Sequence, residues 1–308
     1  MPQAKSVEEK IVRLLEDRGP QTGAELREAL GEDGFGQWKT CMRSTRLVVR
    51  RVGRRYLRLD HKVEGYARLS PSILREFLTY SVVGLAGGTA ALDLRTEELA
   101  AHARDISAAK LKLAQRVIGD IGSRLLEDER SEELRFCVLL AGDIVYEMGH
   151  DAPRPERSTG RMVRGSDLDL VVIMDDQAPD ELAQQLDDAI YEQKYRHLIN
   201  PSIREEIDYV IKPLERLKEQ AEFDTFKNMV PCKILDEAVW LYGSRTLFRA
   251  AKAVLAERGI PEKLAVMEQA AIQAREQAEK HLLSRDEGNL KGDDLYLFYS
   301  AEESDEFD

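Results

Sequence analysis

The sequence predicts an α+β protein in which helices and small sheets follow one another along several domains. Short apolar runs that are typical of buried strands occur at residues 136–141 and 168–174, and residues 206–211 predict a third strand with Ile207, Tyr209 and Ile211 on one face. Longer stretches with an apolar residue at every third or fourth position, typical of amphipathic helices, lie on both sides of these runs. The chain has 308 residues, which is enough for two or three domains with a core each.

The composition predicts a soluble protein in a reducing compartment. Hydrophobic residues make up 43% of the chain and charged residues 33%, as in ordinary globular proteins. The cysteines Cys41, Cys137 and Cys232 are far apart, which argues against a zinc ribbon or a disulfide framework. The longest uncharged run, residues 77–92, is too short and too rich in glycine for a membrane span, and the N-terminus has no apolar leader. We therefore expect a cytoplasmic protein with no membrane partner.

Residues 1–66 predict a winged helix-turn-helix domain. Apolar residues at helical spacing indicate three short helices, the third of which is centred on Trp38. Residues 47–52 and 54–59, joined by Gly53, predict a β-hairpin that would form the wing.

A concentrated positive charge lies within this domain, although the whole chain has a net charge of −12. Residues 39–62 hold nine basic residues and one acidic residue. Such a patch is typical of nucleic-acid binding, in which phosphate contacts supply most of the affinity. We expect the third helix to enter a groove and the wing to contact the backbone, and a basic face that packs on another domain is the alternative. The candidate nucleic-acid-binding residues are Lys39, Arg43, Arg46, Arg50, Arg51, Arg54, Arg55 and Arg58.

The remaining segments outside the central strands predict helices and a tail. Residues 67–130 predict a helical spacer, and residues 246–290 predict C-terminal helices. Residues 291–308 form an acidic tail, of which residues 301–308 are expected to be disordered.

The most informative segment for chemistry is residues 165–173. Asp167 and Asp169 stand at the head of an apolar strand, two positions apart, so their side chains project from the same face. Two like charges beside a buried strand are unfavourable unless a cation lies between them. Carboxylate oxygens are the ligands that Mg²⁺ prefers. The segment therefore predicts a divalent-metal site for Mg²⁺, with Mn²⁺ as the alternative ion.

A third carboxylate, Asp208, lies on the next predicted strand. Residues 179–195 predict a helix between the two strands, so that both strands can belong to one sheet. Asp208 can then approach Asp167 and Asp169. Three convergent carboxylates are what a two-metal phosphoryl-transfer site requires.

These elements resemble the nucleotidyltransferase superfamily typified by DNA polymerase beta, in particular its oligoadenylate-synthase-like and minimal branches. The resemblance is carried by the Asp-x-Asp strand at residues 166–170, the lead-in at 158–165, Asp208, and the helix and turn at 233–243. It implies a catalytic core at residues 131–245, with a small mixed sheet flanked by helices. It also implies an NTP substrate. The residues that it assigns to catalysis and metal binding are Asp167, Asp169 and Asp208.

The turn after the first strand departs from the family pattern. The family has a Gly-Ser turn there, whose hydroxyl and amides hold the triphosphate, whereas this chain has Gly142 and Asp143. A carboxylate beside phosphates is repulsive unless it binds a metal or accepts hydrogen bonds elsewhere. This departure predicts an unusual nucleotide pose or a degenerate core. The candidate nucleotide-binding residues are Gly142, Asp143, Ser166 and Lys233.

The expected activity is transfer of a nucleoside monophosphate from an NTP to a hydroxyl, with release of pyrophosphate. Nucleic acid is the favoured acceptor, RNA or tRNA ends above all, and a role as the toxin of a bacterial defence module fits the same chemistry. The alternative is a nucleic-acid-binding regulator whose degenerate core only senses nucleotide. A solvated turn at Ser166–Asp169, in which the carboxylates cap backbone amides, is the structural alternative. The sequence leaves the oligomeric state open.

Overall fold

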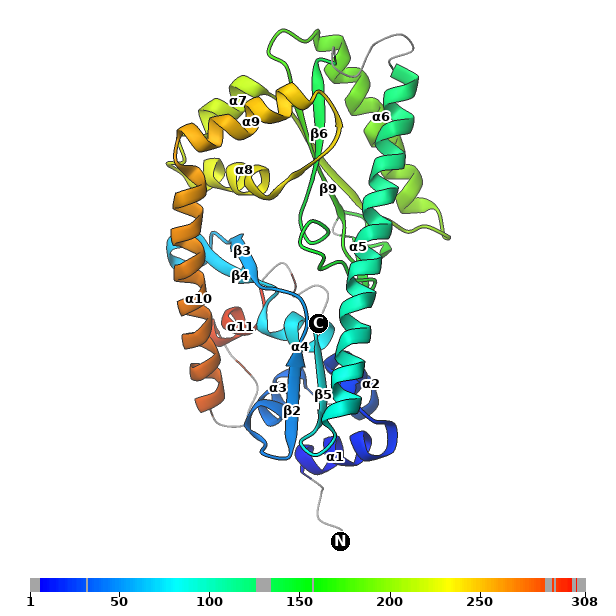
Figure 1. The fold of residues 1–308 in the computed structure, drawn as a ribbon, viewed down its shortest axis with the longest axis vertical. Helices are drawn as coiled ribbons and strands as arrows, with labels where there is room; N and C mark the ends of the chain where they lie inside the picture. The colour runs from blue at the N-terminus through cyan, green and yellow to red at the C-terminus, as the bar shows by residue number, and fades with distance from the viewer. Residues whose placement is uncertain are drawn as a thin grey trace. The chain divides into compact units, whose positions relative to one another are not determined.

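The computed structural model describes residues 6–31, 33–125, 134–156, 158–285, 290, 292–300 and 303. It combines helices with small sheets, which confirms the α+β prediction (Figure 1). The chain divides into two compact units. The first unit comprises Met1–Leu57, Arg68–His102 and Gln269–Asp308, and the second comprises Arg58–Ala67 and Ala103–Glu268.

The first unit packs short helices around a three-stranded antiparallel sheet with the strand order β1-β5-β2. Ser6 and Thr22 each begin a helix with a capping box, in which side chain and backbone satisfy each other's hydrogen bonds. The elements up to β5 are α1 (Val7–Arg18), β1 (Gln21–Thr22), α2 (Gly23–Leu30), α3 (Gly34–Arg43), β2 (Leu47–Arg51), β3 (Tyr56–Leu59), β4 (Ala67–Ser70), α4 (Ile73–Thr79) and β5 (Ser81–Leu85).

The predicted hairpin of residues 47–52 and 54–59 is wrong. The strand β2 pairs with β5, with Val49 opposite Val83, whereas β3 pairs with β4. Val82 and Val83 are fully buried, so β5 supplies the apolar middle strand that the local sequence after β2 lacks.

The predicted helical spacer of residues 67–130 also needs correction. It contains the strands β4 and β5 before the long helix α5 (Thr89–Leu125) begins. The uncharged run at 77–92 suits both a buried helix and a buried strand, and its β-branched valines decide for a strand at β5. Residues 126–130 lie outside the described part of the chain.

The C-terminal segment belongs to the core of the first unit. Its helices are α10 (Ile260–Ser284), whose last part lies in this unit, and α11 (Asp293–Phe298). Leu282 and Phe298 are buried in the core, and the ring of Phe298 lies 5.4 Å from that of Phe35 and 5.5 Å from that of Trp38. The expectation that residues 291–308 form an acidic tail is therefore corrected for the part that forms α11. Of the segment expected to be disordered, all residues except Glu303 lie outside the described residues.

The second unit is built on a four-stranded mixed sheet with the strand order β10-β9-β6-β11. The strand β9 runs parallel to β10, and β6 runs antiparallel to β9 and β11. The strands are β6 (Phe136–Ala141), β9 (Leu168–Met174), β10 (Ile207–Pro213) and β11 (Val239–Gly243). Three of them coincide with the predicted strands, and β11 replaces the turn that was expected there.

Helices cover both faces of this sheet (Figure 1). The second half of α5 and the helix α6 (Asp180–Ile199) pack on the face that carries Leu168 and Leu170. On the opposite face lie α8 (Phe226–Glu237) and α9 (Arg245–Glu257), and the short α7 (Leu214–Gln220) contacts both of these helices. A small two-stranded sheet of β7 (Pro153–Pro155) and β8 (Met162–Arg164) lies between β6 and β9 in the chain.

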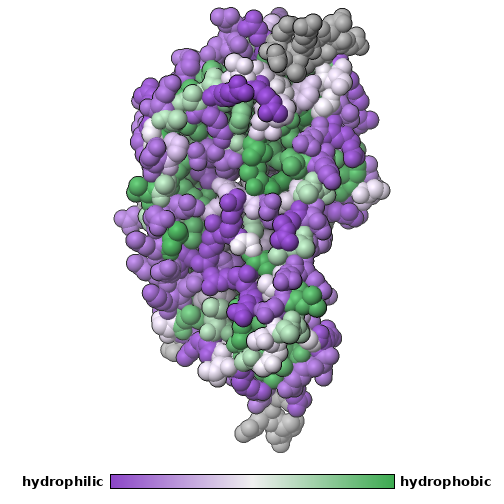
Figure 2. All heavy atoms as spheres, viewed as in Figure 1, coloured by the Kyte–Doolittle hydropathy of each residue, from purple (hydrophilic) through white to green (hydrophobic). Residues whose placement is uncertain are grey.

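The visible face of the molecule is mostly hydrophilic, and its apolar residues gather in separate patches between hydrophilic ones (Figure 2). Among the described residues, no helix combines the length and the apolar character that crossing a bilayer demands.

Candidate metal centre

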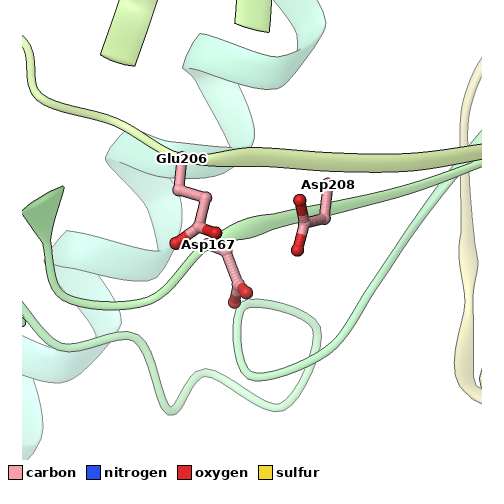
Figure 3. A group of neighbouring side chains, drawn as sticks. All are labelled: Asp167, Glu206 and Asp208. Carbon is pink, nitrogen blue, oxygen red and sulfur yellow. The ribbon is translucent and has the colours of Figure 1, made fainter. Parts of the chain in front are cut away.

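Four carboxylates meet where β9 and β10 begin. In the parallel register of these strands, Asp208 lies beside Asp169. Asp167 and Glu206 each precede one of the two strands, and the amide of Leu168 donates to the carbonyl of Glu206 at 2.9 Å. One oxygen each of Asp167, Glu206 and Asp208 lies within 4.8 Å of the other two (Figure 3). The predicted approach of Asp208 to Asp167 is thus present, and these three residues can hold a metal ion.

Asp169 is directed toward the turn that follows β6. A Cβ at Gly142 would lie 2.2 Å from Asp169 Oδ2, and Gly142 has a φ of +78°, so this turn requires glycine. Burial raises the pKa of Asp169, and the charges of Asp167, Asp143 and Asp208 raise it further. Asp169 therefore lies next to the other carboxylates, between β9 and the turn that follows β6.

Glu206 was missed in the sequence analysis, although a signal was present. Glu206 and Asp208 repeat on β10 the alternation of Asp167 and Asp169 on β9. Glu206 is buried, and burial raises the pKa of its carboxyl to about 7; the charges of Asp167 and Asp208 add to the shift, and Arg154 opposes it.

Two cations partly neutralise the cluster, and neither was predicted. Arg154, on β7, places Nη2 at 2.8 Å from Glu206 and 3.5 Å from Asp167. Lys194, on α6, donates to Asp208 Oδ1 at 2.7 Å. Without such partners, like charges at this spacing would repel one another in a partly buried place.

The candidate nucleotide-binding residues at the turn are joined by hydrogen bonds. The Ser166 hydroxyl donates to Asp143 Oδ2 at 3.3 Å and accepts from the amide of His150 at 3.1 Å. Ser166 is buried, so its hydroxyl connects the two loops that precede and follow β7 and β8. Asp143 is close enough to Asp169 to raise the pKa of that residue.

Lys233 lies on the other side of the same turn. Its ammonium forms an ion pair with Glu237, and the amide of Gly142 donates to Glu237 at 3.3 Å. The side chain of Lys233 is 11% exposed. Lys233 therefore supports the turn through Glu237 and does not present its charge to solvent.

The predicted nucleic-acid-binding face of α3 is covered. Lys39 is 3% exposed, and its ammonium donates to the carbonyl of Arg285 in the C-terminal segment. Gln37, two residues earlier on the same helix, is fully buried. The expectation that this face of α3 enters a groove is corrected, because α10 and α11 complete the core of the first unit over it.

Arg55 is only partly exposed, because its guanidinium forms ion pairs. It donates to Glu76 at 2.6 and 2.8 Å and to Glu279 at 2.6 Å. Arg51 forms an ion pair with Glu76 at 3.3 Å and remains 46% exposed. These arginines stabilise the first unit by neutralising Glu76, whose pKa is lowered by hydrogen bonds and charges from Arg55 and Arg275 against the opposing effect of burial.

The other predicted basic residues are exposed. Arg58 belongs to the second unit, where its positive charge acts to lower the pKa of Asp169. Arg50 forms an exposed ion pair with Asp93 at 3.5 Å. Of the predicted residues, the exposed arginines in the first unit, apart from Arg51, are Arg43, Arg46, Arg50 and Arg54.

Comparison with known proteins adds no assignment to this geometry. No family model matches the chain, and no curated protein matches it. The resemblance to nucleotidyltransferases therefore remains a prediction from the residues of this chain.

Proposed function

We propose that the protein is a metal-dependent nucleotidyltransferase that moves a nucleoside monophosphate from an NTP to a hydroxyl acceptor. The observation that carries the proposal is the meeting of Asp167, Glu206 and Asp208 at the starts of two parallel strands, with Asp169 beside them. Convergent carboxylates on neighbouring strands of a small mixed sheet are what this chemistry needs.

The donor set fits Mg²⁺ or Mn²⁺. The available ligand atoms are carboxylate oxygens, and three of them lie within 4.8 Å of one another. Asp167 and Asp208 would hold the ion together with Glu206 or Asp169. When bound, such a metal neutralises the triphosphate and lowers the pKa of the acceptor hydroxyl.

The turn at Gly142 and Asp143 supports a nucleotide site in spite of its carboxylate. Asp143 accepts a hydrogen bond from Ser166, which stabilises its negative charge and reduces the repulsion that its carboxylate would exert on a phosphate. Gly142 is held by Glu237, so the backbone of the turn keeps one position beside the metal centre. We infer that the turn holds the nucleotide through its backbone in place of a serine hydroxyl.

Nucleic acid is the acceptor that the first unit favours. The order α1, β1, α2, α3, β2, β5 supports a winged-helix fold, with a long segment between β2 and β5 in place of a simple wing. Because Lys39 on α3 is covered whereas these arginines are exposed, we infer that phosphates are bound through Arg43, Arg46, Arg50 and Arg54 and that no base sequence is read.

Label transfer tests the activity. The protein is incubated with each α-³²P-labelled NTP and Mg²⁺, together with RNA, DNA or protein as acceptor. We expect label on nucleic acid, and we expect D167N and D208N to abolish it while the exposed α5 variant D105N retains it. Equal labelling by D167N and the wild type would contradict the proposal.

A regulator with a degenerate core is the second candidate, and Asp143 in place of a hydroxyl residue favours it. Such a protein would bind an NTP without turning it over. Calorimetric titration with a nonhydrolysable NTP separates the two candidates, since nucleotide binding with no label transfer on any acceptor identifies the regulator.

A further inference from the structure

We propose that Arg154 is a positioning residue of the metal centre and that the β7–β8 sheet holds it there. This inference rests on the proposed function, because it concerns the same carboxylates. Arg154 lies opposite Val163 in the antiparallel register of β7 and β8, and both residues are buried. Their neighbours Pro153 and Met162 are exposed, so this small sheet turns one face inward and places the guanidinium on that face.

The guanidinium joins three segments that meet at the metal centre. Its Nε donates to the carbonyl of Gly165 at 2.7 Å, and its Nη2 lies 2.8 Å from Glu206 and 3.5 Å from Asp167. One planar group therefore contacts the turn before β9, the residue before β10 and one carboxylate of the predicted Asp-x-Asp pair. A planar guanidinium that contacts several groups at once sets their relative orientation, which a single ammonium cannot do.

The turn that Arg154 holds has little freedom of its own. A Cβ on Gly165 would lie 1.7 Å from the carbonyl oxygen of His150, and the φ of Gly165 is +60°. The amide of Ser166 donates to that same carbonyl at 3.0 Å. Asp167 follows directly, so the direction of its carboxylate depends on where this turn is held.

A counter-ion and a positioning residue predict opposite results for metal binding. If Arg154 only neutralised the carboxylates, its removal would strengthen the binding of a cation, because a nearby positive charge would be lost. If it positions Asp167, its removal weakens binding in spite of that electrostatic gain. The charge-conserving variant R154K separates geometry from charge most directly.

The test measures Mn²⁺ binding to the full chain by electron paramagnetic resonance, without nucleotide, together with the melting temperature. We expect R154K to bind Mn²⁺ at least tenfold more weakly than the wild type. The matched control R161K, at an exposed arginine before β8, is expected to bind as the wild type does.

A second pair of variants separates weaker Mn²⁺ binding from a loss of folding. R154M leaves the buried Glu206 without its cation, so we expect a lower melting temperature, which R154M/E206Q restores. We expect R154M/E206Q to bind Mn²⁺ at least tenfold more weakly than E206Q alone. Equal or tighter binding in either comparison would overturn the positioning role. No Mn²⁺ binding by the wild type would instead overturn the proposed function, and this inference with it.

Discussion

At the scale of single residues, the metal centre brings like charges together on neighbouring strands. The parallel register puts Asp208 beside Asp169, and the preceding Glu206 and Asp167 continue the arrangement. Like charges in direct register weaken a sheet, so the remaining partners of these residues determine what they do. Arg154 holds two of the carboxylates and Lys194 holds a third.

The raised pKa of Glu206 predicts a pH dependence of stability. Its pKa in the folded protein is about 7, against an ordinary value of 4.5, so folding favours the protonated form. The stabilisation is complete below about pH 4.5 and is lost as the pH rises to about 7. We expect the free energy of unfolding of the metal-free protein to fall by roughly 3 kcal/mol more than that of E206Q over this range. Denaturant titrations at successive pH values measure the difference, and identical profiles would contradict the prediction.

Lys194 and Arg154 are expected to act in opposite directions on metal binding. Lys194 makes a single contact, to Asp208, from a side chain that is 26% exposed, and a metal ion would compete for that oxygen. We therefore expect K194M to bind Mn²⁺ several-fold more tightly than the wild type. Calorimetric titration measures the change, with K112M, at an exposed lysine on α5, as the control. Weaker binding by K194M would show that the lysine supports the site.

At the scale of secondary-structure elements, the covering of α3 is the main difference from expectation. The sequence predicts that α3 enters a nucleic-acid groove through its charged face. The structure buries the aromatic face against Phe298 and also covers Lys39. An amphipathic pattern identifies the face that is certain to be buried, and it does not exclude that the polar face is covered by a distant segment.

The packing of α11 on α3 can be measured through stability. Phe298 is 2% exposed, so we expect F298A to lower the free energy of unfolding of the first unit by about 3–5 kcal/mol. Fluorescence of Trp38 in a W240F background reports on this unit alone. The neighbouring L297A removes a side chain that is 39% exposed and should change stability far less. Equal stabilities of F298A and L297A would contradict the described packing.

The elements that matched their predictions share a physical property. The strands β6 and β9 are mostly apolar runs, β10 begins with alternating apolar and polar residues, and α6 and α9 show apolar residues at helical spacing. These signals are local and can be recognised within a few residues. The strand β5 lacked such a distinctive signal, because a uniformly apolar run suits a buried helix as well as a buried strand.

At the scale of the whole molecule, an acidic chain carries the exposed arginines that we propose bind phosphates. The chain carries a net charge of −12, so nucleic acid is repelled except where positive charge is concentrated. The burial of Lys39 and the ion pairs of Arg55 leave fewer basic residues for phosphate contacts than the sequence suggests. Nucleic-acid binding should therefore be weaker and less steeply salt-dependent than eight contacts would imply.

The salt dependence of binding tests which arginines take part. We expect R43A/R46A to weaken binding to double-stranded nucleic acid and to reduce the slope of log K against log salt by about 2, since each phosphate contact contributes about 0.9. Fluorescence anisotropy at several salt concentrations gives the slope. The control R13A/R18A removes the same charge from α1, and an equal effect of both variants would point to net charge instead of a defined site.

The sequence alone determined the features that depend on neighbouring residues: the strands at 136–141 and 168–174, and the alternation that places Asp167 and Asp169 on one face. Periodicity and apolar runs are local, so they survive without knowledge of the fold. Only the tertiary structure decided that Glu206 and Arg154 join these carboxylates, and that the charged face of α3 is covered. Those outcomes depend on which distant segments pack together. A charged residue that the local pattern places on the surface can be buried by such a segment.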